Sequence, residues 1–335
     1  MNQLIALTKR IQNHKVMLIG DMVADVYLEG KISRISREAP VLILEHQAEN
    51  VVPGGAANAV HNTATLGGLV YAVGVVGQDS AGEQLANILN EKSVNTNGFI
   101  IDDMRPTITK TRIMAGGQAT VRQQIVRVDR EKKEPLSATV EQQVLTYIMN
   151  NIADMKAVIL SDYGSHTITP VIIKEVINFC RKRSIPCIVD SRYNIMAYKG
   201  VTVVKQNESE AAAAVGYTLL DHDKLKDAGL SILKQLDAEA VLITRGPDGM
   251  ILFERSGNIT NIPVTNKSEV YDVTGAGDTV VATMTLALAS GATYLEAARL
   301  ANYAAGVVVR KPGTATTTPI ELCEAIGEHH ETNRA

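Results

Sequence analysis

YDVTGAGDTV, residues 271–280, places three small residues and a carboxylate where a polar segment gives way to a long apolar run. The run, residues 280–309, has a helical pattern, so Gly275-Ala276-Gly277 lie at or just before a helix N-terminus. Backbone N–H groups at such a terminus are uncovered, with the positive end of the helix dipole behind them. Such a place binds anions, and phosphate above all. Asp278 works against a purely electrostatic anion site, so its presence indicates chemistry beside a bound phosphate.

The composition is that of an ordinary globular protein. The chain has 335 residues, 45% of them hydrophobic and 21% charged, and a net charge of −3. No block is dense in lysine and arginine, which argues against nucleic-acid binding. No apolar stretch of membrane-spanning length is free of polar residues, and the N-terminus lacks a signal-peptide pattern. Three scattered cysteines without metal spacing fit a reduced, cytoplasmic setting.

Short apolar runs alternate with helical patterns from end to end. Six runs are candidates for buried strands: 16–20, 70–76, 157–162, 186–190, 202–205 and 240–246. This alternation predicts an α/β fold with a doubly wound, mostly parallel sheet that helices cover on both faces. Several runs end in a polar residue or a glycine, and ligands of such sheets bind at the C-terminal ends of the strands.

Residues 22–47 and 99–129 break this rhythm. They alternate apolar and polar residues, which is typical of antiparallel strands. Both flank core strands, so we expect them to form a small β-sheet over one edge of the core, in the position of a lid. Residues 1–335 then make one domain, with the lid inserted into the α/β core.

A second glycine pair, Gly54-Gly55, precedes a helical stretch whose first turn carries Asn58. The pair lets the backbone approach a ligand closely, or it simply forms a tight loop before the helix. A third segment, 205–216, has Asn207 after a strand and Glu210 three residues later. That spacing is typical of a helix capping box, and equally of a polar pair that organises Mg²⁺ and its waters.

Other nucleotide and metal motifs are absent from the sequence. GAGDTV lacks the third glycine of the dinucleotide fingerprint and lies far from the first strand. No GxxxxGK[ST] or HExxH occurs, and no zinc-binding set of histidines is evident. TRGPDGM, residues 244–250, reads as a turn between two strands.

Taken together, these segments resemble the ribokinase-like (PfkB) carbohydrate kinases across about residues 14–328. Their order and spacing both fit the family. The residues that carry the resemblance are Gly20-Asp21, Gly54-Gly55-Ala56-Ala57-Asn58, Asn207-Glu208-Ser209-Glu210, Thr244-Arg245-Gly246 and Asp272-Val273-Thr274-Gly275-Ala276-Gly277-Asp278. The resemblance implies an ATP- and Mg²⁺-dependent sugar kinase. In this family the carboxylate at the position of Asp278 takes the proton of the attacking hydroxyl, and the glycine-loop amides form an anion hole for the γ-phosphoryl group.

The resemblance also assigns the binding residues. Those for the nucleotide are Asn207, Glu208, Ser209, Glu210, Thr244, Gly246 and Asn302, with Glu210 acting on Mg²⁺ through water. Asp272 and Thr274 match positions that hold a monovalent cation, so K⁺ is a candidate cofactor. The sugar would rest on Asp21, Gly54, Gly55 and Asn58. Relatives often dimerise through their lids, and because a small sheet has open edges, we expect a homodimer of this kind.

Three pieces of the expected lid, 33–41, 106–112 and 123–129, resemble the heptose-7-phosphate kinases of lipopolysaccharide-precursor synthesis. This implies phosphorylation of C1 of D-glycero-D-manno-heptose 7-phosphate. The candidates for contact with that sugar phosphate are Arg34, Lys110, Arg112 and Gln124, and the alternative for the three cations is a solvated charge at a strand edge. Bifunctional members of the group carry a fused nucleotidyltransferase domain, for which we expect this chain to be too short.

Two departures leave the sugar open. SDYGSHT, residues 161–167, lacks a lysine that related sequences carry, and DSRY, residues 190–193, stands where Asp-Pro-Lys is usual; Arg192 keeps one charge there. The alternatives are a kinase for another sugar or sugar phosphate, such as fructose 6-phosphate or a ribose-like sugar, and a non-catalytic sugar- or nucleotide-binding regulator. The intact Asp278 and glycine loop argue against the regulator.

Overall fold

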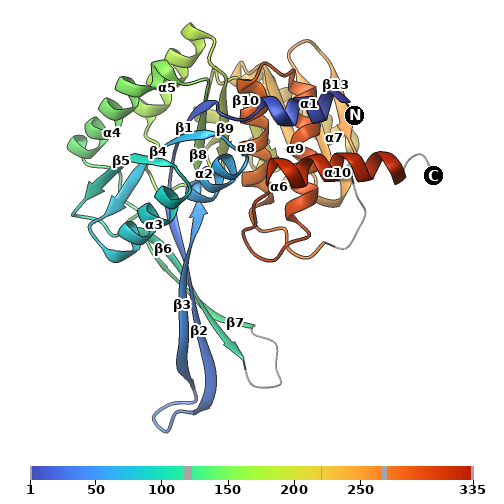
Figure 1. Cartoon of the computed structure of the whole chain (residues 1–335). Helices are drawn as coiled ribbons and strands as arrows, with labels where there is room; N and C mark the ends of the chain where they lie inside the picture. The colour runs from blue at the N-terminus through green and yellow to red at the C-terminus, as the bar shows by residue number, and fades with distance from the viewer. Residues whose placement is uncertain (1, 117–122, 220, 266–269, 333–335) are drawn as a thin grey trace.

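Two β-sheets of different size organise the chain (Figure 1). The computed structural model describes residues 2–116, 123–219, 221–265 and 270–332. A nine-stranded sheet forms the core, with helices on both of its faces, and a four-stranded sheet projects from one side of it. The predicted α/β fold with a doubly wound, mostly parallel sheet and a small second sheet is confirmed.

The large sheet has the strand order β13-β12-β11-β10-β9-β8-β1-β4-β5. Its strands are β1 (Lys15–Gly20), β4 (Leu69–Gly77), β5 (Asn95–Asp102), β8 (Ala157–Asp162), β9 (Cys187–Ser191), β10 (Val203–Asn207), β11 (Ala240–Thr244), β12 (Met250–Glu254) and β13 (Ile259–Ile262). The antiparallel pairs of this sheet are β11–β12 and β12–β13, at one edge. β1 lies between β4 and β8, so the strand order reverses there. A doubly wound sheet opens its ligand crevice at such a reversal.

Helices cover both faces of this sheet, because strand side chains alternate between two apolar clusters. One face packs against α1 (Asn2–Arg10), α2 (Ala56–Thr65), α3 (Ser80–Glu91), α8 (Ala276–Ala289), α9 (Tyr294–Val308) and α10 (Pro319–Thr332). The other packs against α4 (Ala138–Asn151), α5 (Pro170–Arg183), α6 (Glu208–Val215) and α7 (His222–Leu236). Short 3-10 turns are η1 (Ile152–Asp154), η2 (Ile195–Ala197) and η3 (Gly246–Asp248). Among the described residues, no helix is long and apolar enough to cross a membrane.

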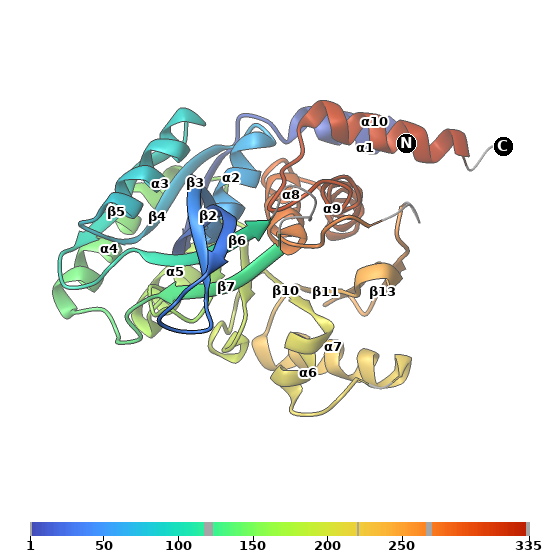
Figure 2. The same cartoon turned by 90° about the horizontal axis from the view of Figure 1, so that it is seen from below.

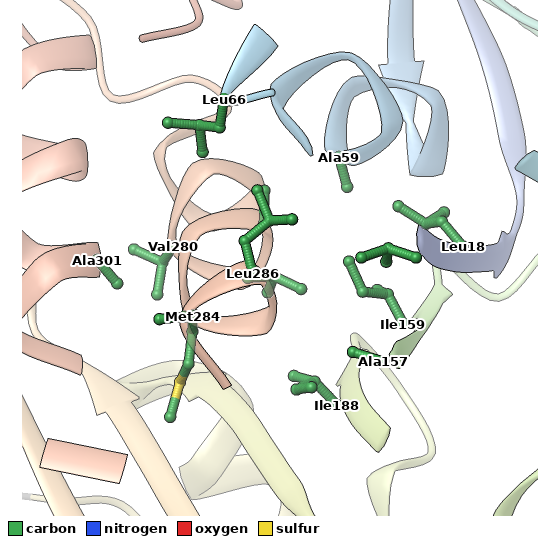
Figure 3. Packing of buried hydrophobic residues seen from close by; sticks show 14 of the residues in the cluster. Leu18, Ala59, Leu66, Ala157, Ile159, Ile188, Val280, Met284, Leu286 and Ala301 are labelled. Atoms are coloured by element: carbon green, nitrogen blue, oxygen red, sulfur yellow. The ribbon is translucent and has the colours of Figure 1, made fainter. Parts of the chain in front are cut away.

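The apolar run 280–309 is not one helix but two. α8 ends near Gly291, which has a φ of 82°, and α9 begins behind a capping box formed by Thr293 and Glu296. α8 is buried along most of its length because α9 packs on one side of it and the sheet on another. Figure 3 shows Leu286 of α8 among the sheet and helix residues of this core.

The small sheet has the strand order β3-β2-β6-β7. Its strands are β2 (Met22–Ile35), β3 (Leu42–Gly55), β6 (Ile108–Gly116) and β7 (Gln123–Arg130). The β2–β3 hairpin extends well away from the helices (Figure 1), and in the view from below it points toward the viewer (Figure 2). The sequence predicted antiparallel pairing throughout, which is wrong for the central pair, because β2 and β6 run parallel.

The extent of this sheet also differs from the expected lid. Its first arm continues to Gly55, whereas residues 99–102 pair with β4 and belong to the large sheet. Residues 117–122, expected within the lid, lie outside the described residues. β5 is a half-buried edge strand, and such a strand alternates in the same way as a strand of a small exposed sheet. The alternation of apolar and polar residues therefore could not show that 99–102 belong to the large sheet rather than to the small one.

We predict that Leu286→Ala lowers the free energy of unfolding by about 2–5 kcal/mol, because it leaves a cavity where packing is closest. Leu286 is completely buried between α8 and the sheet. Urea unfolding followed by circular dichroism measures the change. Leu230→Ala in α7 is the matched control: this leucine is 42% exposed, so its loss costs about 1 kcal/mol or less. Equal losses in the two variants would contradict the packing described.

Candidate active site

The N-terminus of α8 faces the strand-order reversal and carries the residues of the opening motif. Gly275 caps the helix with a φ of 80°, a conformation that only glycine adopts without strain. A side chain there would also approach the Asn58 amide to 2.7 Å. The glycine therefore permits both the turn and the close contact between α8 and α2.

Asp278 lies in the first turn of α8, and both of its carboxylate oxygens accept a hydrogen bond. Asn58 Nδ2 donates to Oδ2 at 2.6 Å, and the Tyr163 hydroxyl donates to Oδ1 at 2.9 Å. Burial raises the pKa of Asp278 to about 6, and the negative charge of Asp190 adds to the rise, while Asn58, Lys205 and Tyr163 oppose it. A carboxylate with a pKa nearer neutrality is a stronger general base than an exposed aspartate.

A second contact fixes α2 against α8. Asn62 donates from Nδ2 to the Asn58 carbonyl at 3.0 Å, and its Oδ1 accepts a hydrogen bond from the Thr279 hydroxyl at 2.7 Å. Asn58 and Asn62 are one helical turn apart, so they form hydrogen bonds with the successive residues Asp278 and Thr279. The position of the carboxylate is thus set by two helices that are distant in sequence.

A buried ion pair lies beside the glycine loop. Lys205 Nζ is 2.8 Å from Asp190 Oδ2, and both side chains are almost fully buried. A Cβ added to Gly277 would lie 2.7 Å from Lys205 Nζ, so the ammonium is close to the loop backbone. Burial lowers the pKa of Lys205, but Asp190, Glu210 and Asp278 outweigh it and raise the pKa. The lysine is therefore charged, and its cation supports an anion site at the loop.

The segment 207–210 forms a capping box at the start of α6. Asn207 Oδ1 accepts from the Glu210 N–H at 2.8 Å, and Glu210 Oε2 accepts from the Asn207 N–H at 2.8 Å. Ser209 also donates to Asn207 Oδ1, and Glu208 pairs with Arg245 at 2.9 Å. Burial raises the pKa of Glu210, with Asp190 adding to the rise. The predicted capping box is therefore present, and the role of this segment in binding Mg²⁺ and the nucleotide stays a prediction.

The predicted nucleotide residues from β11 lie beside this box. Asn207 and Thr244 are partners in the β10–β11 pairing. Gly246 has a φ of 53°, and a Cβ there would meet no atom within 4 Å, so it faces open space. Asn302 lies on α9, and its amide donates to the Pro263 carbonyl at 2.7 Å. That amide hydrogen bond holds the chain segment after β13.

Asp272 joins two loops near the start of α8. Its carboxylate accepts from the N–H of Thr274 at 2.9 Å and of Gly313 at 3.1 Å. Burial tends to raise the pKa of Asp272, but these hydrogen bonds outweigh it and lower the pKa. An ionised carboxylate held between loops fits the oxygen donors that a monovalent cation needs. Among the described residues, no group of three or more histidine, cysteine or acidic side chains could hold a metal ion.

Asp21 and the glycine pair, which are predicted sugar contacts, lie at the ends of β1 and β3. Asp21 is completely buried, and its carboxylate accepts from three backbone N–H groups of the loop after β8. Gly54 lies so close to Asp25 that a Cβ would be 2.6 Å from the carboxylate. Gly55, with a φ of 52°, is the N-cap residue of α2. Asp21 thus holds a loop in this structure, and its contact with a sugar stays a prediction.

Two of the predicted lid residues lie at the base of the small sheet. Lys110 Nζ lies over the ring of Tyr163, 5.8 Å from its centroid. Arg112 pairs with Asp25 at 2.8 Å and lies over the ring of Tyr27. The charge of Arg112 is therefore matched by a carboxylate, whereas Lys110 points toward the Asp278 region.

Within one copy of the chain, Arg34 and Gln124 lie away from this site, and their contact with the sugar phosphate stays a prediction. Arg34 is eleven residues further along β2 than Val23, which is about 36 Å at roughly 3.3 Å per residue. Gln124 is exposed and pairs with Met114, partway along the projecting sheet. The physical reason is the length of the strands, which carries both side chains away from the crevice.

Three site residues were missed by the sequence prediction: Tyr163, Asp190 and Lys205. Each stands at or near the C-terminal end of a core strand, the edge where ligands bind. Ionisable residues at the ends of predicted buried strands were thus the sequence feature that could have indicated them. The distances between these residues along the sequence do not show which of them meet around Asp278.

Known carbohydrate kinases are similar to this chain in sequence and in fold. The model of the pfkB family carbohydrate kinases matches residues 13–321. The bifunctional protein HldE of Geobacter sulfurreducens is 41% identical over 315 residues, which are 94% of this chain and 63% of that protein. HldE of Nitratiruptor sp. is 41% identical over 310 residues, which are 92% of this chain and 64% of that protein. The chain thus spans just under two thirds of these relatives.

Solved structures share the fold. Escherichia coli phosphofructokinase-2 in complex with potassium has a TM-score of 0.76 at 21% identity, covering 95% of this chain and 100% of that one. Arabidopsis thaliana ribokinase complexed with ribose and ATP has a TM-score of 0.70 at 18% identity, covering 94% and 99%. The chain belongs to the pfkB family of carbohydrate kinases. Carbohydrate kinases of this kind transfer a phosphoryl group to an alcohol group of a sugar.

We predict that kcat/KM for the sugar falls as the pH drops through about 6, where Asp278 becomes protonated. Only the ionised carboxylate accepts the hydroxyl proton, so the rate should decrease by about tenfold for each pH unit below that pKa. Initial rates of ADP release, with Mg²⁺ in excess so that ATP stays complexed, measure the profile. A flat profile across this range would count against Asp278 as the base.

Proposed function

We propose that this chain is an ATP- and Mg²⁺-dependent kinase that phosphorylates C1 of D-glycero-D-manno-heptose 7-phosphate to the 1,7-bisphosphate, in the cytoplasm, for ADP-heptose and lipopolysaccharide precursors. The observation that carries the kinase chemistry is the buried Asp278 at the glycine-capped start of α8. The choice of sugar is supported by the resemblance of residues 33–41, 106–112 and 123–129 to heptose-7-phosphate kinases. Similarity to proteins named HldE supports it as well.

The residues of the crevice suit phosphoryl transfer, which needs positioning and charge neutralisation more than covalent chemistry. The amides of Gly275–Gly277 and the Lys205 ammonium would hold the γ-phosphoryl group. Asp278 would orient the C1 hydroxyl and take its proton late in the transfer. Glu210 would hold Mg²⁺ through water, and the ion would offset the negative charge of the ATP phosphates. Asp272 and Thr274 would hold K⁺ beside the glycine loop.

Cations near Tyr163 are the best candidates for the 7-phosphate. Lys110 lies over the tyrosine ring, and the positive charge of Arg192 is felt by Tyr163. Arg112 is a weaker candidate because Asp25 already neutralises it. A kinase for fructose 6-phosphate or a ribose-like sugar remains the alternative within the family.

The small sheet is proposed as the dimer contact, with a second copy of the chain as the partner. Its exposed apolar side chains are Ile32, Ile35, Val41, Leu42, Ile125, Val126 and Val128. A sheet that projects from the core with apolar residues on its surface gains stability when a partner covers it. In such a pair, the distal end of one sheet could approach the base of the other. Arg34 would then act in the partner's site rather than its own.

We predict turnover of heptose 7-phosphate in a coupled assay of ADP release, and little or none of fructose 6-phosphate, ribose or fructose. Asp278→Asn should lower kcat by at least about 100-fold through loss of the base. Lys110→Met should raise KM for the sugar phosphate about tenfold, since one charged contact is worth that much. Lys31→Met, in the distal part of the same strand pair, is the control. Turnover confined to another sugar would keep the kinase and discard the heptose.

We also predict that Val128→Asp converts a dimer into a monomer, because it places a charge on the apolar surface of β7, where this valine is 53% exposed. Light scattering after size-exclusion chromatography gives the mass. Leu230→Asp, on the surface of α7, is the matched control and should stay dimeric. A wild-type protein that is monomeric at all concentrations tested would refute the lid contact.

A further inference from the structure

Tyr163 occupies an unusual place beside the base. It follows β8, and its hydroxyl donates to Asp278 Oδ1 at 2.9 Å. Burial raises the pKa of Tyr163 well above its ordinary value, and the charge of Asp278 raises it further. The hydroxyl therefore keeps its proton and acts as a donor to the ionised carboxylate. In the mechanism above, no step uses this tyrosine.

The backbone of Tyr163 is held by Asp21. The Asp21 carboxylate accepts from the N–H groups of Tyr163 at 2.8 Å, Ser165 at 3.0 Å and Thr167 at 3.1 Å. Three hydrogen bonds to one buried carboxylate fix the course of the loop at 163–167. Asp21 therefore acts on Asp278 indirectly: it holds the backbone of Tyr163, whose hydroxyl donates to Asp278.

The small sheet contacts the same loop at two points. Lys110 of β6 lies over the Tyr163 ring. The Ser165 hydroxyl donates to Glu131, the residue that follows β7, at 3.1 Å. The loop that carries Tyr163 is thus held by Asp21, which follows β1, and by the end of the small sheet where β6 begins and β7 ends.

An ionised carboxylate has about four lone-pair sites, two on each oxygen. Asn58 takes a site on Oδ2 and Tyr163 takes a site on Oδ1. With a donor on each oxygen, rotation of the carboxylate would break both hydrogen bonds. The two remaining sites then point in fixed directions, and the acceptor hydroxyl of a sugar must come to one of them.

We propose that Tyr163 is a positioning residue for phosphoryl transfer, which holds the Asp278 carboxylate in the orientation that receives the sugar hydroxyl and links that orientation to the loop under the lid. This proposal rests on the proposed kinase function. The charged and titratable groups around the pair are Asp190 on β9, Lys205 on β10, Lys110 on β6 and Arg192 after β9. Of these, Asp190 raises the pKa of Asp278, and Lys205 lowers it together with Tyr163 and Asn58.

The first test is Tyr163→Phe in the full chain, which removes the hydroxyl and keeps the ring under Lys110. Because the hydrogen bond favours the charged carboxylate, its loss should move the acidic limb of kcat/KM upward by about one pH unit. kcat should fall by about tenfold, with a smaller change in KM for ATP. The same shift should appear in the carboxyl carbon resonance of Asp278, titrated in protein labelled with carbon-13 aspartate and assigned through Asp278→Asn.

The matched control is Tyr198→Phe. The Tyr198 hydroxyl donates to Asp162 at 2.7 Å, so this variant loses a buried tyrosine–aspartate hydrogen bond that does not involve Asp278. It should lose comparable thermal stability and leave the pH limb in place. If Tyr163→Phe folds poorly, 3-fluorotyrosine at position 163 gives the opposite change: a more acidic hydroxyl strengthens the hydrogen bond and moves the limb downward.

The outcomes separate this proposal from the kinase proposal. The positioning role would be overturned if, in Tyr163→Phe, the acidic limb of kcat/KM and the titration midpoint of the Asp278 carboxyl resonance both stayed at their wild-type pH. It would also be overturned if both moved equally in Tyr198→Phe. If the wild-type chain phosphorylates no sugar in the panel, the proposed function fails. The carboxyl titration then still decides whether Tyr163 controls Asp278.

Discussion

The burial of one carboxylate between two hydrogen-bond donors is the constraint on which the site depends. Asp278 is almost inaccessible to water, and it is tolerated there because Asn58 and Tyr163 each donate to one of its oxygens. An unpaired buried carboxylate would cost several kcal/mol or would take up a proton. The two donors keep it ionisable near neutral pH, and burial keeps its basicity above that of an exposed aspartate.

Each of those donors requires a different part of the fold. Asn58 is placed by α2, which can approach α8 only because Gly275 has no side chain. Tyr163 is placed by the loop after β8, which the buried Asp21 holds from β1. The strand-order reversal between β1 and β8 puts these elements at one edge of the sheet. The strand order of the sheet therefore determines which side chains meet around Asp278.

Lys205 and Asp190 are also buried charges that are tolerated because each has a partner. They pair at 2.8 Å, and removal of either partner would leave an uncompensated charge. The pair sets a positive group against the backbone of the glycine loop, where a transferred phosphoryl group would carry its negative charge. The small sheet closes the arrangement from above through Lys110, whereas its distal half points away from the body of the chain.

The sequence by itself determined the α/β class, the positions of six core strands, the capping box at Asn207 and Glu210, and the glycine turn that puts Asp278 at the start of a helix, because these depend on local periodicity and turn chemistry. Only the tertiary structure decided that β2 and β6 run parallel, that residues 99–102 join the large sheet, and that Arg34 lies far from the crevice. It also revealed Tyr163 and Lys205 beside the base. Their roles come from contacts between segments more than seventy residues apart, and no local pattern encodes which distant side chains will meet.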